Sequence, residues 1–254
     1  MATREVTQQD TMGLFEHLGE LRQRLFRSII SWIVATVIAM NFVDTLVGWL
    51  ALPIRNASGG NVSLIVLSPT EAPIIYFKIA LAGGFALALP FILYQIYGFV
   101  APGLYPNERS ILLLGIPAAM FFFILGAMFT LQLLIPFGLP MLMGFLGTVV
   151  QPTYSLENYL GFVTTLVVWM GLLFQTPLII YVIARLGVVT PKQLGSARRS
   201  VWFGAVLFAA IVTPTHDPIT MLMATVPFIV LYELGIVFAR VAVKQRRKAV
   251  KDYV

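Results

Sequence analysis

The stretch FVAPGLYPNERS, Phe99–Ser110, separates two long uncharged runs and decides what kind of fold this chain can adopt. Two prolines and a glycine break regular structure within it, and its only charged residues are Glu108 and Arg109. The runs on either side, 74–100 and 111–135, are each long enough to cross a hydrocarbon core of about 30 Å as a helix. The stretch is therefore predicted to be a tight loop beside a membrane.

The composition of the whole chain supports a membrane protein. Of its 254 residues, 59% are apolar and 11% are charged, whereas soluble domains are about 45–50% apolar and about 25% charged. The apolar runs are continuous rather than alternating, which favours helices over a barrel. Cysteine is absent, which excludes disulfides, thiolate metal sites and thiol nucleophiles. The predicted class is an all-α, polytopic membrane protein.

Six spans are predicted within a single membrane domain, 1–254. After the first span we expect a segment interrupted by prolines and glycines, and after the third a loop over 136–157. A basic tail, 239–254, is expected to be disordered and attracted to anionic lipid. Prolines inside four of the spans should bend their helices. The predicted spans are 29–50, 74–100, 111–135, 159–186, 201–212 and 219–238.

The distribution of lysine and arginine predicts the orientation of these spans. If the spans alternate in direction, 15 of the 17 basic residues fall on one side of the membrane, and only Arg55 and Lys78 do not. Loops rich in lysine and arginine stay in the cytoplasm. Both termini are therefore expected to be cytoplasmic.

The fifth predicted span is short. Its 12 residues would rise about 18 Å as a helix, against about 30 Å of hydrocarbon. Either the bilayer thins there, or the following turn lies below the outer surface. The alternative is that this span begins near Leu194, with Arg198 and Arg199 reaching back to the interface.

No enzyme signature is present. The sequence contains no H-E-x-x-H, G-x-S-x-G or P-loop motif. Its only histidines, His17 and His216, are predicted to lie at opposite faces of the membrane. We therefore expect no catalytic residues, no metal and no cofactor, and an intramembrane enzyme is disfavoured.

Two carboxylates lie where charge is unexpected. Glu20 and Glu108 are both predicted at the cytoplasmic edge, beside apolar runs. Glu20 could simply pair with Arg24 four residues on, and Glu108 could be a loop charge or sit at a helix N-terminus, where an anion is favoured. Together they suggest an anionic patch for a peptide with two guanidinium groups, which bind carboxylates bidentately.

Two polar residues lie deeper or on the outer side. Gln175 is about ten residues from Arg185, roughly 15 Å into the bilayer. An amide at that depth needs a partner on another helix. We predict a partner subunit's helix, with a bridge between helices of this chain as the alternative. Asp217 falls in a short outer turn, where it could also be an ordinary turn residue before Pro218.

Four stretches in this order, together with six spans, resemble the TatC family: HLGELRQRL, SPTEAPIIYFKIAL, PFILYQIYGFVAPGLYPNER and TPTHDPIT. The resemblance implies the core receptor subunit of the twin-arginine protein translocase. With single-span TatA and TatB partners, in multiple copies, such a subunit exports folded proteins across the bacterial cytoplasmic (inner) membrane, driven by the proton-motive force. It also implies a cupped, glove-like set of kinked helices with short spans five and six. No nucleic-acid partner is expected.

The resemblance also assigns roles to individual residues. Glu20 and Glu108 match the two glutamates that bind the paired arginines of the signal peptide, and Asp217 matches an acid in the last outer turn. One position departs from the family, because Gln175 stands where a glutamate is frequent, and an amide cannot titrate. Four further matches are the arginines of the ELRQRL motif, a first-loop aromatic residue and the proline after span one, namely Arg22, Arg24, Phe99 and Pro53.

A small-solute secondary transporter is the alternative function. Kinked spans with polar residues inside the membrane are typical of that class. Against it, the two halves of the chain show no inverted repeat, and few charges lie inside the spans to form an ion site.

Overall fold

The structure is a bundle of long helices. It is a computed structural model, which describes residues 5–57, 64–100, 106–144, 153–212 and 218–251. In chain order the elements are α1 (Glu5–Ala39), the 3-10 turn η1 (Met40–Phe42), α2 (Val43–Ala57), β1 (Leu64–Ile65), α3 (Glu71–Val100), α4 (Pro106–Phe129), the π-helical turn η3 (Thr130–Leu134), α5 (Ile135–Gly144), β2 (Tyr154–Ser155), α6 (Leu156–Leu173), α7 (Thr176–Leu186), α8 (Pro191–Ser196), α9 (Arg198–Val212) and α10 (Pro218–Lys251).

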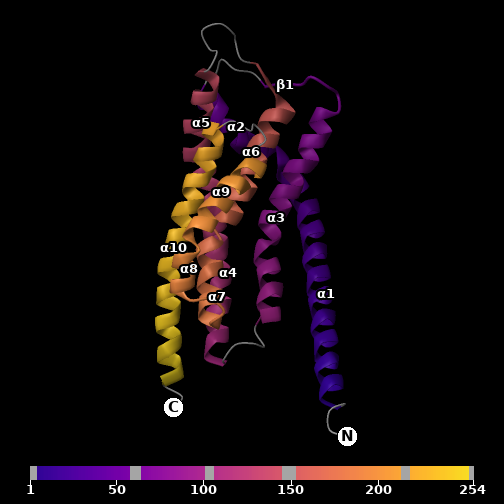
Figure 1. Ribbon diagram of the computed structural model, residues 1–254. Helices are drawn as coiled ribbons and strands as arrows, with labels where there is room; N and C mark the ends of the chain where they lie inside the picture. The colour runs from indigo at the N-terminus through magenta and orange to yellow at the C-terminus, as the bar shows by residue number, and fades with distance from the viewer. Residues whose placement is uncertain (1–4, 58–63, 101–105, 145–152, 213–217, 252–254) are drawn as a thin grey trace.

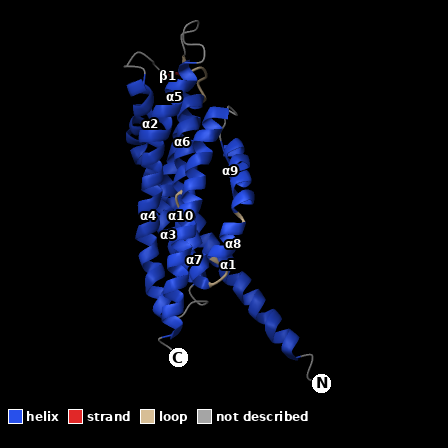
Figure 2. Ribbon diagram, turned by 60° about the vertical axis from the view of Figure 1, so that its left-hand side comes forward, coloured by secondary structure: helices blue, strands red, loops and turns tan. Residues whose placement is uncertain are grey.

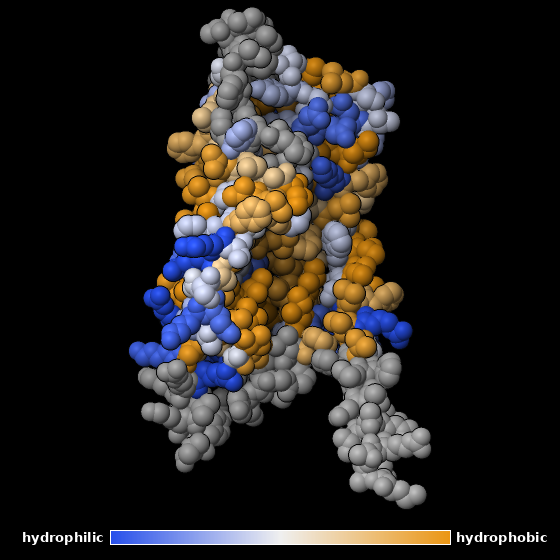
Figure 3. Space-filling view, in the orientation of Figure 1, coloured by the Kyte–Doolittle hydropathy of each residue, from blue (hydrophilic) through white to orange (hydrophobic). Residues whose placement is uncertain are grey.

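The predicted fold class is confirmed. Within the described ranges, five helical stretches are long and apolar enough to cross a membrane. α9 is shorter than these five, so the number of six spans stays a prediction. The start of α1 and the end of α10 lie at the same end of the molecule (Figure 1). In Figure 3 the surface is hollowed between α1 and the side formed by α8 and α10, and apolar residues line the hollow.

Two predicted breaks in the chain are helical instead. The helix after η1 continues past the predicted end of span one to Ala57 with Pro53 inside it, and Pro53 and Ile54 are buried there. Likewise, the predicted loop after span three begins as α5. A π-helical turn precedes Pro136, and its wider turn accommodates a residue that has no N–H to donate. Proline therefore marked neither helix end.

A proline does break the fourth predicted span. α6 ends at Leu173 and α7 begins at Thr176, with Pro177 in the first turn of α7. Proline suits that position because its N–H would have no helical partner. The stretch remains one candidate span, 156–186, with the helix interrupted at Phe174 and Gln175 directly before the proline. The other three prolines lie inside helices as predicted, namely Pro90, Pro117 and Pro227.

The predicted disordered tail is also helical, because α10 continues to Lys251. Ala239 and Ala242 are fully buried and pack in a cluster with Ile180 of α7. Nearby, the Tyr181 hydroxyl donates to Gln245 Oε1 at 2.8 Å. Packing on α7 therefore orders a segment whose composition alone predicts a disordered, solvated end.

Small residues let α1 and α3 approach closely. A Cβ placed on Gly84 would lie 2.4 Å from Oγ1 and 2.5 Å from Cα of Thr36. Close backbone approach through small residues is how helices associate within lipid. At the outer end, β1 pairs in parallel with β2, with Leu64 opposite Tyr154 and Ile65 opposite Ser155.

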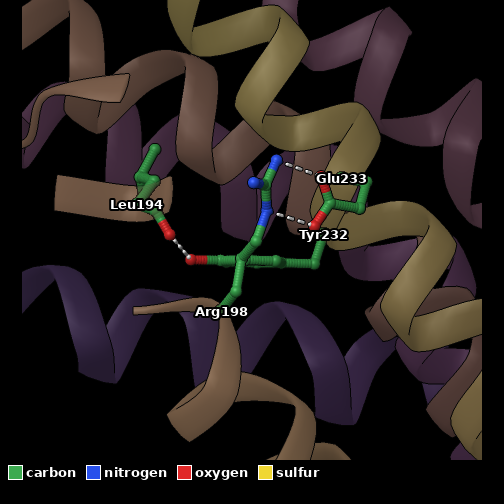
Figure 4. A network of polar contacts seen from close by, with 4 residues as sticks. All are labelled: Leu194, Arg198, Tyr232 and Glu233. Atoms are coloured by element: carbon green, nitrogen blue, oxygen red, sulfur yellow. Dashed lines mark hydrogen bonds and ion pairs between the residues drawn. The ribbon is translucent and has the colours of Figure 1, made fainter. Parts of the chain in front are cut away.

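The short helix α9 is fastened to α10 at its start. It has 15 residues, or about 22 Å of rise, so the predicted shortness is confirmed although it begins three residues earlier. Leu194 belongs to the separate helix α8, so a continuous helix from that point is not formed. Arg198 binds both carboxylate oxygens of Glu233 at 2.7 Å, and the Tyr232 hydroxyl donates to Leu194 O at 2.7 Å (Figure 4). Figure 2 shows α8 and α9 at one side of the molecule.

Replacing Gly84 with alanine should force α1 and α3 apart. Overpacking of this kind costs about 1–3 kcal/mol, which lowers the melting temperature by about 2–4 °C per kcal/mol in a chain of this size. Thermal unfolding of the detergent-purified protein measures the change. Gly115→Ala is the matched control, because a Cβ there meets nothing within 4 Å. Equal melting temperatures for the two variants would contradict the close approach.

The Arg198–Glu233 pair should respond asymmetrically to removal of one partner. Arg198→Gln leaves a carboxylate within an apolar span, whereas Glu233→Gln leaves a long side chain that can reach the interface. We expect Arg198→Gln to lower the melting temperature by a few degrees more than Glu233→Gln. The opposite order would mean that the pair does not fasten α9.

Candidate functional site

The predicted pairing of Glu20 with Arg24 is present in α1. Arg24 donates from Nε at 2.9 Å and from Nη2 at 2.6 Å to Glu20 Oε1. The side chain of Glu20 is 35% exposed and that of Arg24 is 24% exposed. Glu20 is thus accessible at the surface, and one of its oxygens already accepts two hydrogen bonds from the Arg24 guanidinium.

This pair lies against the end of α3. A Cβ on Gly98 would be 2.0 Å from Nη1 and 2.7 Å from Cζ of Arg24, so a larger residue there would displace the guanidinium from this position. The adjacent Phe99 is half-buried. Three of the predicted residues, Glu20, Arg24 and Phe99, therefore gather where α1 and α3 meet, while Arg22 is exposed on α1.

The structure places Glu108 only by its backbone. It is the third residue of α4, and its side chain lies outside the described residues. The start of α4 lies at the same end of the molecule as the end of α3 (Figure 1). The pairing of Glu20 with Glu108 in one patch therefore stays a prediction.

Of the other predicted site residues, Pro53 does not join this group. Pro53 is buried in α2, close to Gln132 and Pro136 around a cavity of about 740 Å³. In Figure 1, α2 lies toward the end of the molecule opposite the start of α1. Asp217 lies outside the described residues.

Gln175 is buried in the turn between α6 and α7, where it is 6% exposed. Its Nε2 donates to Ala119 O of α4 at 2.9 Å and to Gly171 O at 3.3 Å. Its Oε1 is buried and has no hydrogen-bond partner among the described residues. The alternative of a bridge between helices of this chain is therefore present, and contact with another subunit stays a prediction.

The two carbonyl groups explain why an amide suits this position. Both carbonyl oxygens accept from the side-chain NH₂ of Gln175, which has two N–H groups to donate. An ionised glutamate would instead place negative charge against two carbonyl oxygens in a buried setting, and a protonated one has a single O–H, so it could donate to only one of them.

Sequence reasoning missed two polar contacts between distant segments. Ser155 Oγ donates to the buried Glu71 Oε2 at 3.1 Å, and the same hydroxyl accepts from Asn158 N as the N-cap of α6. A serine just before an apolar run is a recognisable N-cap signal. The partner of Glu233 carried no such signal, because Arg198 is 35 residues away in sequence.

Comparison with known proteins identifies close relatives of this fold and sequence. The family described as Sec-independent protein translocase protein (TatC) matches residues 16–227. TatC of Deinococcus radiodurans is 38% identical over 90% of this chain and 86% of that protein, and TatC of Aquifex aeolicus is 37% identical over 94% of this chain and 100% of that protein. The crystal structure of a twin-arginine translocase receptor, TatC, superposes with a TM-score of 0.81 at 38% identity, covering 89% of this chain and 99% of that one.

Proposed function

The chain belongs to the TatC family of Sec-independent protein translocase proteins, and we propose that it is the receptor that binds the paired arginines of twin-arginine signal peptides through Glu20 and Glu108. The family transports proteins and is not an enzyme family, and the apolar helices make this chain a multi-pass membrane protein. As the receptor, it would pass folded proteins across the bacterial cytoplasmic membrane at the expense of the proton-motive force.

The observation that carries the proposal is the contact between Glu20 and Arg24. A partly exposed carboxylate is held at the meeting of α1 and α3, with one guanidinium group already on it. Such an i,i+4 pair stabilises a helix by only about 0.3–0.5 kcal/mol. An incoming arginine can therefore take the carboxylate from Arg24, or share it, at little cost. Glu108, from the first turn of α4, would receive the second arginine.

The distribution of basic residues supports cytoplasmic termini. Hydrophilic residues gather at the lower left of Figure 3, on the side formed by α8 and α10. This is the end of the molecule where α10 ends and α1 begins (Figure 1). The exposed basic residues of these elements and of the α9 start include Lys192, Arg199, Arg240 and Lys244.

The described part of the structure gives little support to the alternative function, a small-solute transporter. Among the described residues, the buried charged side chains are Glu71 and Arg185. The first begins α3, and the second is the penultimate residue of α7. Neither provides a charge in the middle of the membrane, where a secondary transporter holds its coupling ion.

Glu20→Ala and Glu108→Ala should each weaken binding of a signal peptide that carries two arginines. A hydrogen bond to a charged group contributes about 1.5–3 kcal/mol, so each loss should raise the dissociation constant at least tenfold. Binding of a fluorescent peptide to the purified chain measures it. Glu157→Ala, in the first turn of α6, is the control and should bind normally. Unchanged affinity in both test variants would remove the receptor site.

We further propose that single-span TatA- and TatB-type subunits are partners and that one of them reaches Gln175. Its Oε1 is buried and has no partner among the described residues, so a donor on an arriving helix could satisfy it once the side chains around the α6–α7 turn move aside. A photo-crosslinking residue at 175 should capture a single-span subunit in native membranes. The same residue at Val226, exposed on α10, is the control and should label lipid. Labelling of lipid alone from position 175 would contradict the contact.

A further inference from the structure

Lys78 is a charged residue within a membrane-spanning helix. It lies in α3 seven residues after the helix begins at Glu71, inside the candidate span Glu71–Phe99, so its Cα is about 10 Å inward of that end. Its side chain is exposed, and it makes no hydrogen bond or ion pair with any other described residue. An ammonium group at this depth is costly without a partner of opposite charge.

The Lys78 side chain reaches sideways to α6 and not outward. A Cβ on Gly161 would lie 3.1 Å from Lys78 Nζ, and apart from neighbouring residues of α6 no other atom would come within 4 Å. The hydrogen bond of 3.1 Å between Ser155 Oγ and Glu71 Oε2 sets the two helices at one level. Gly161 is six residues inward of Ser155, about 9 Å, so the ammonium lies nearly level with the Lys78 Cα. Lysines near a membrane surface usually extend outward instead.

A carboxylate lies one turn further out on the same face of α6. Glu157 precedes Gly161 by four residues, so the two positions are neighbours on the helix about 6 Å apart along its axis. The Glu157 side chain is half-buried, and it forms no ion pair with Lys78 or with any other residue in the described ranges. The start of a helix favours an anion, whereas nothing comparable compensates the charge of Lys78.

The order of these two charges matches the headgroup of one class of lipid. In phosphatidylethanolamine the phosphate lies next to the glycerol, and the primary amine lies further out. A lysine ammonium is a common binding group for phosphate, and a carboxylate accepts hydrogen bonds from an ammonium group. Phosphatidylglycerol has no amine for Glu157, and the methylated amine of phosphatidylcholine has no N–H to donate.

We propose that Lys78 and Glu157 bind the headgroup of one phosphatidylethanolamine from the leaflet at the outer end. The Lys78 ammonium donates to a phosphate oxygen, and the lipid amine donates to the Glu157 carboxylate. Free phosphoethanolamine carries the same two groups. The site lies inside a membrane span, however, where acyl chains anchor a lipid and a soluble molecule gains nothing.

The depth of Lys78 agrees with the short helix α9. The rings of Phe208 in α9 and Trp169 in α6 pack with centroids 5.1 Å apart, which places these two residues at one level. α9 ends at Val212, four residues or about 6 Å further out, whereas Gly161 is eight residues or about 12 Å outward of Trp169. α9 therefore ends inward of the Lys78 ammonium. A bilayer that thins to follow the end of α9 brings lipid phosphates to the depth of Lys78.

The headgroup preference of the purified chain tests the proposal. The full chain in mild detergent is offered equal amounts of phosphatidylethanolamine, phosphatidylglycerol and phosphatidylcholine, and bound lipid is counted by native mass spectrometry. Wild type should retain one phosphatidylethanolamine in preference to the other two. Lys78→Gln should lower this retention several-fold, and Lys78→Arg, which keeps the charge, should retain the lipid. Lys192→Gln removes an exposed cation of α8 and is the matched control, which should keep the preference.

Glu157→Gln distinguishes this site from a simple cation site. Loss of the carboxylate should lower the retention of phosphatidylethanolamine several-fold and raise that of phosphatidylglycerol, because repulsion of an anionic headgroup is removed. Soluble phosphoethanolamine in excess should not displace the bound lipid, since it lacks acyl chains. The Glu157→Gln result decides the matter even if Lys78→Gln fails to fold.

Four results would overturn the proposal. They are a wild-type chain without headgroup preference, an unchanged preference in Glu157→Gln, displacement of the lipid by phosphoethanolamine, and capture of a protein helix rather than lipid by a photo-crosslinking residue at Ile74. Ile74 is exposed one turn outward of Lys78, so such capture would mean that a protein covers the ammonium. Signal-peptide binding is measured separately, so failure here leaves the receptor proposal standing.

Discussion

Backbone polar groups in lipid must find partners within the protein, and this constraint shapes the rest of the structure. In several places a side chain from one helix donates to a backbone carbonyl of another. The Tyr76 hydroxyl donates to Met40 O in the 3-10 turn at 2.8 Å, and Trp32 Nε1 donates to Leu81 O across α1 and α3 at 2.9 Å. The Tyr232 hydroxyl does the same for Leu194 O at the end of α8. The contacts at Met40 and Leu194 lie beside breaks between helical segments, so these two breaks are also points where helices are joined.

The membrane-spanning helices could be predicted from the sequence, but the residues at which they end could not. Continuous hydrophobicity over α3 or α6 indicates a span because nothing else hides so much apolar surface. Helix ends predicted near Pro53 and Pro136 were wrong. The effect of a proline depends on whether a neighbouring turn widens or packing offsets the lost hydrogen bond. The helical tail was missed for a related reason. The burial of Ala239 and Ala242 against α7 is a tertiary effect that a basic composition does not reveal.

For the candidate site, the sequence predicted one contact within a helix and did not predict the contact between helices. The spacing of Glu20 and Arg24 predicted their ion pair, because i,i+4 residues are neighbours on a helix. Their contact with the end of α3 depends on Gly98, whose missing side chain leaves room for a guanidinium. That contact joins residues 74 positions apart, and no local pattern encodes it. The resemblance to TatC supplied Phe99 as a candidate, and Phe99 is the residue directly after this glycine.

Gln175 stands where the resemblance to TatC implies a frequent glutamate, and its contacts show which properties of an acid an amide can keep at this position. The carbonyls of Ala119 and Gly171 both accept from the Gln175 amide, whereas a protonated glutamic acid could donate to one of them. Only the acid can lose its proton, and in this setting ionisation would turn two attractive contacts into repulsive ones. Glutamine therefore holds α4 and the α6–α7 turn together at any pH. A translocation step in this protein that needs a group to gain or lose a proton must use a different residue.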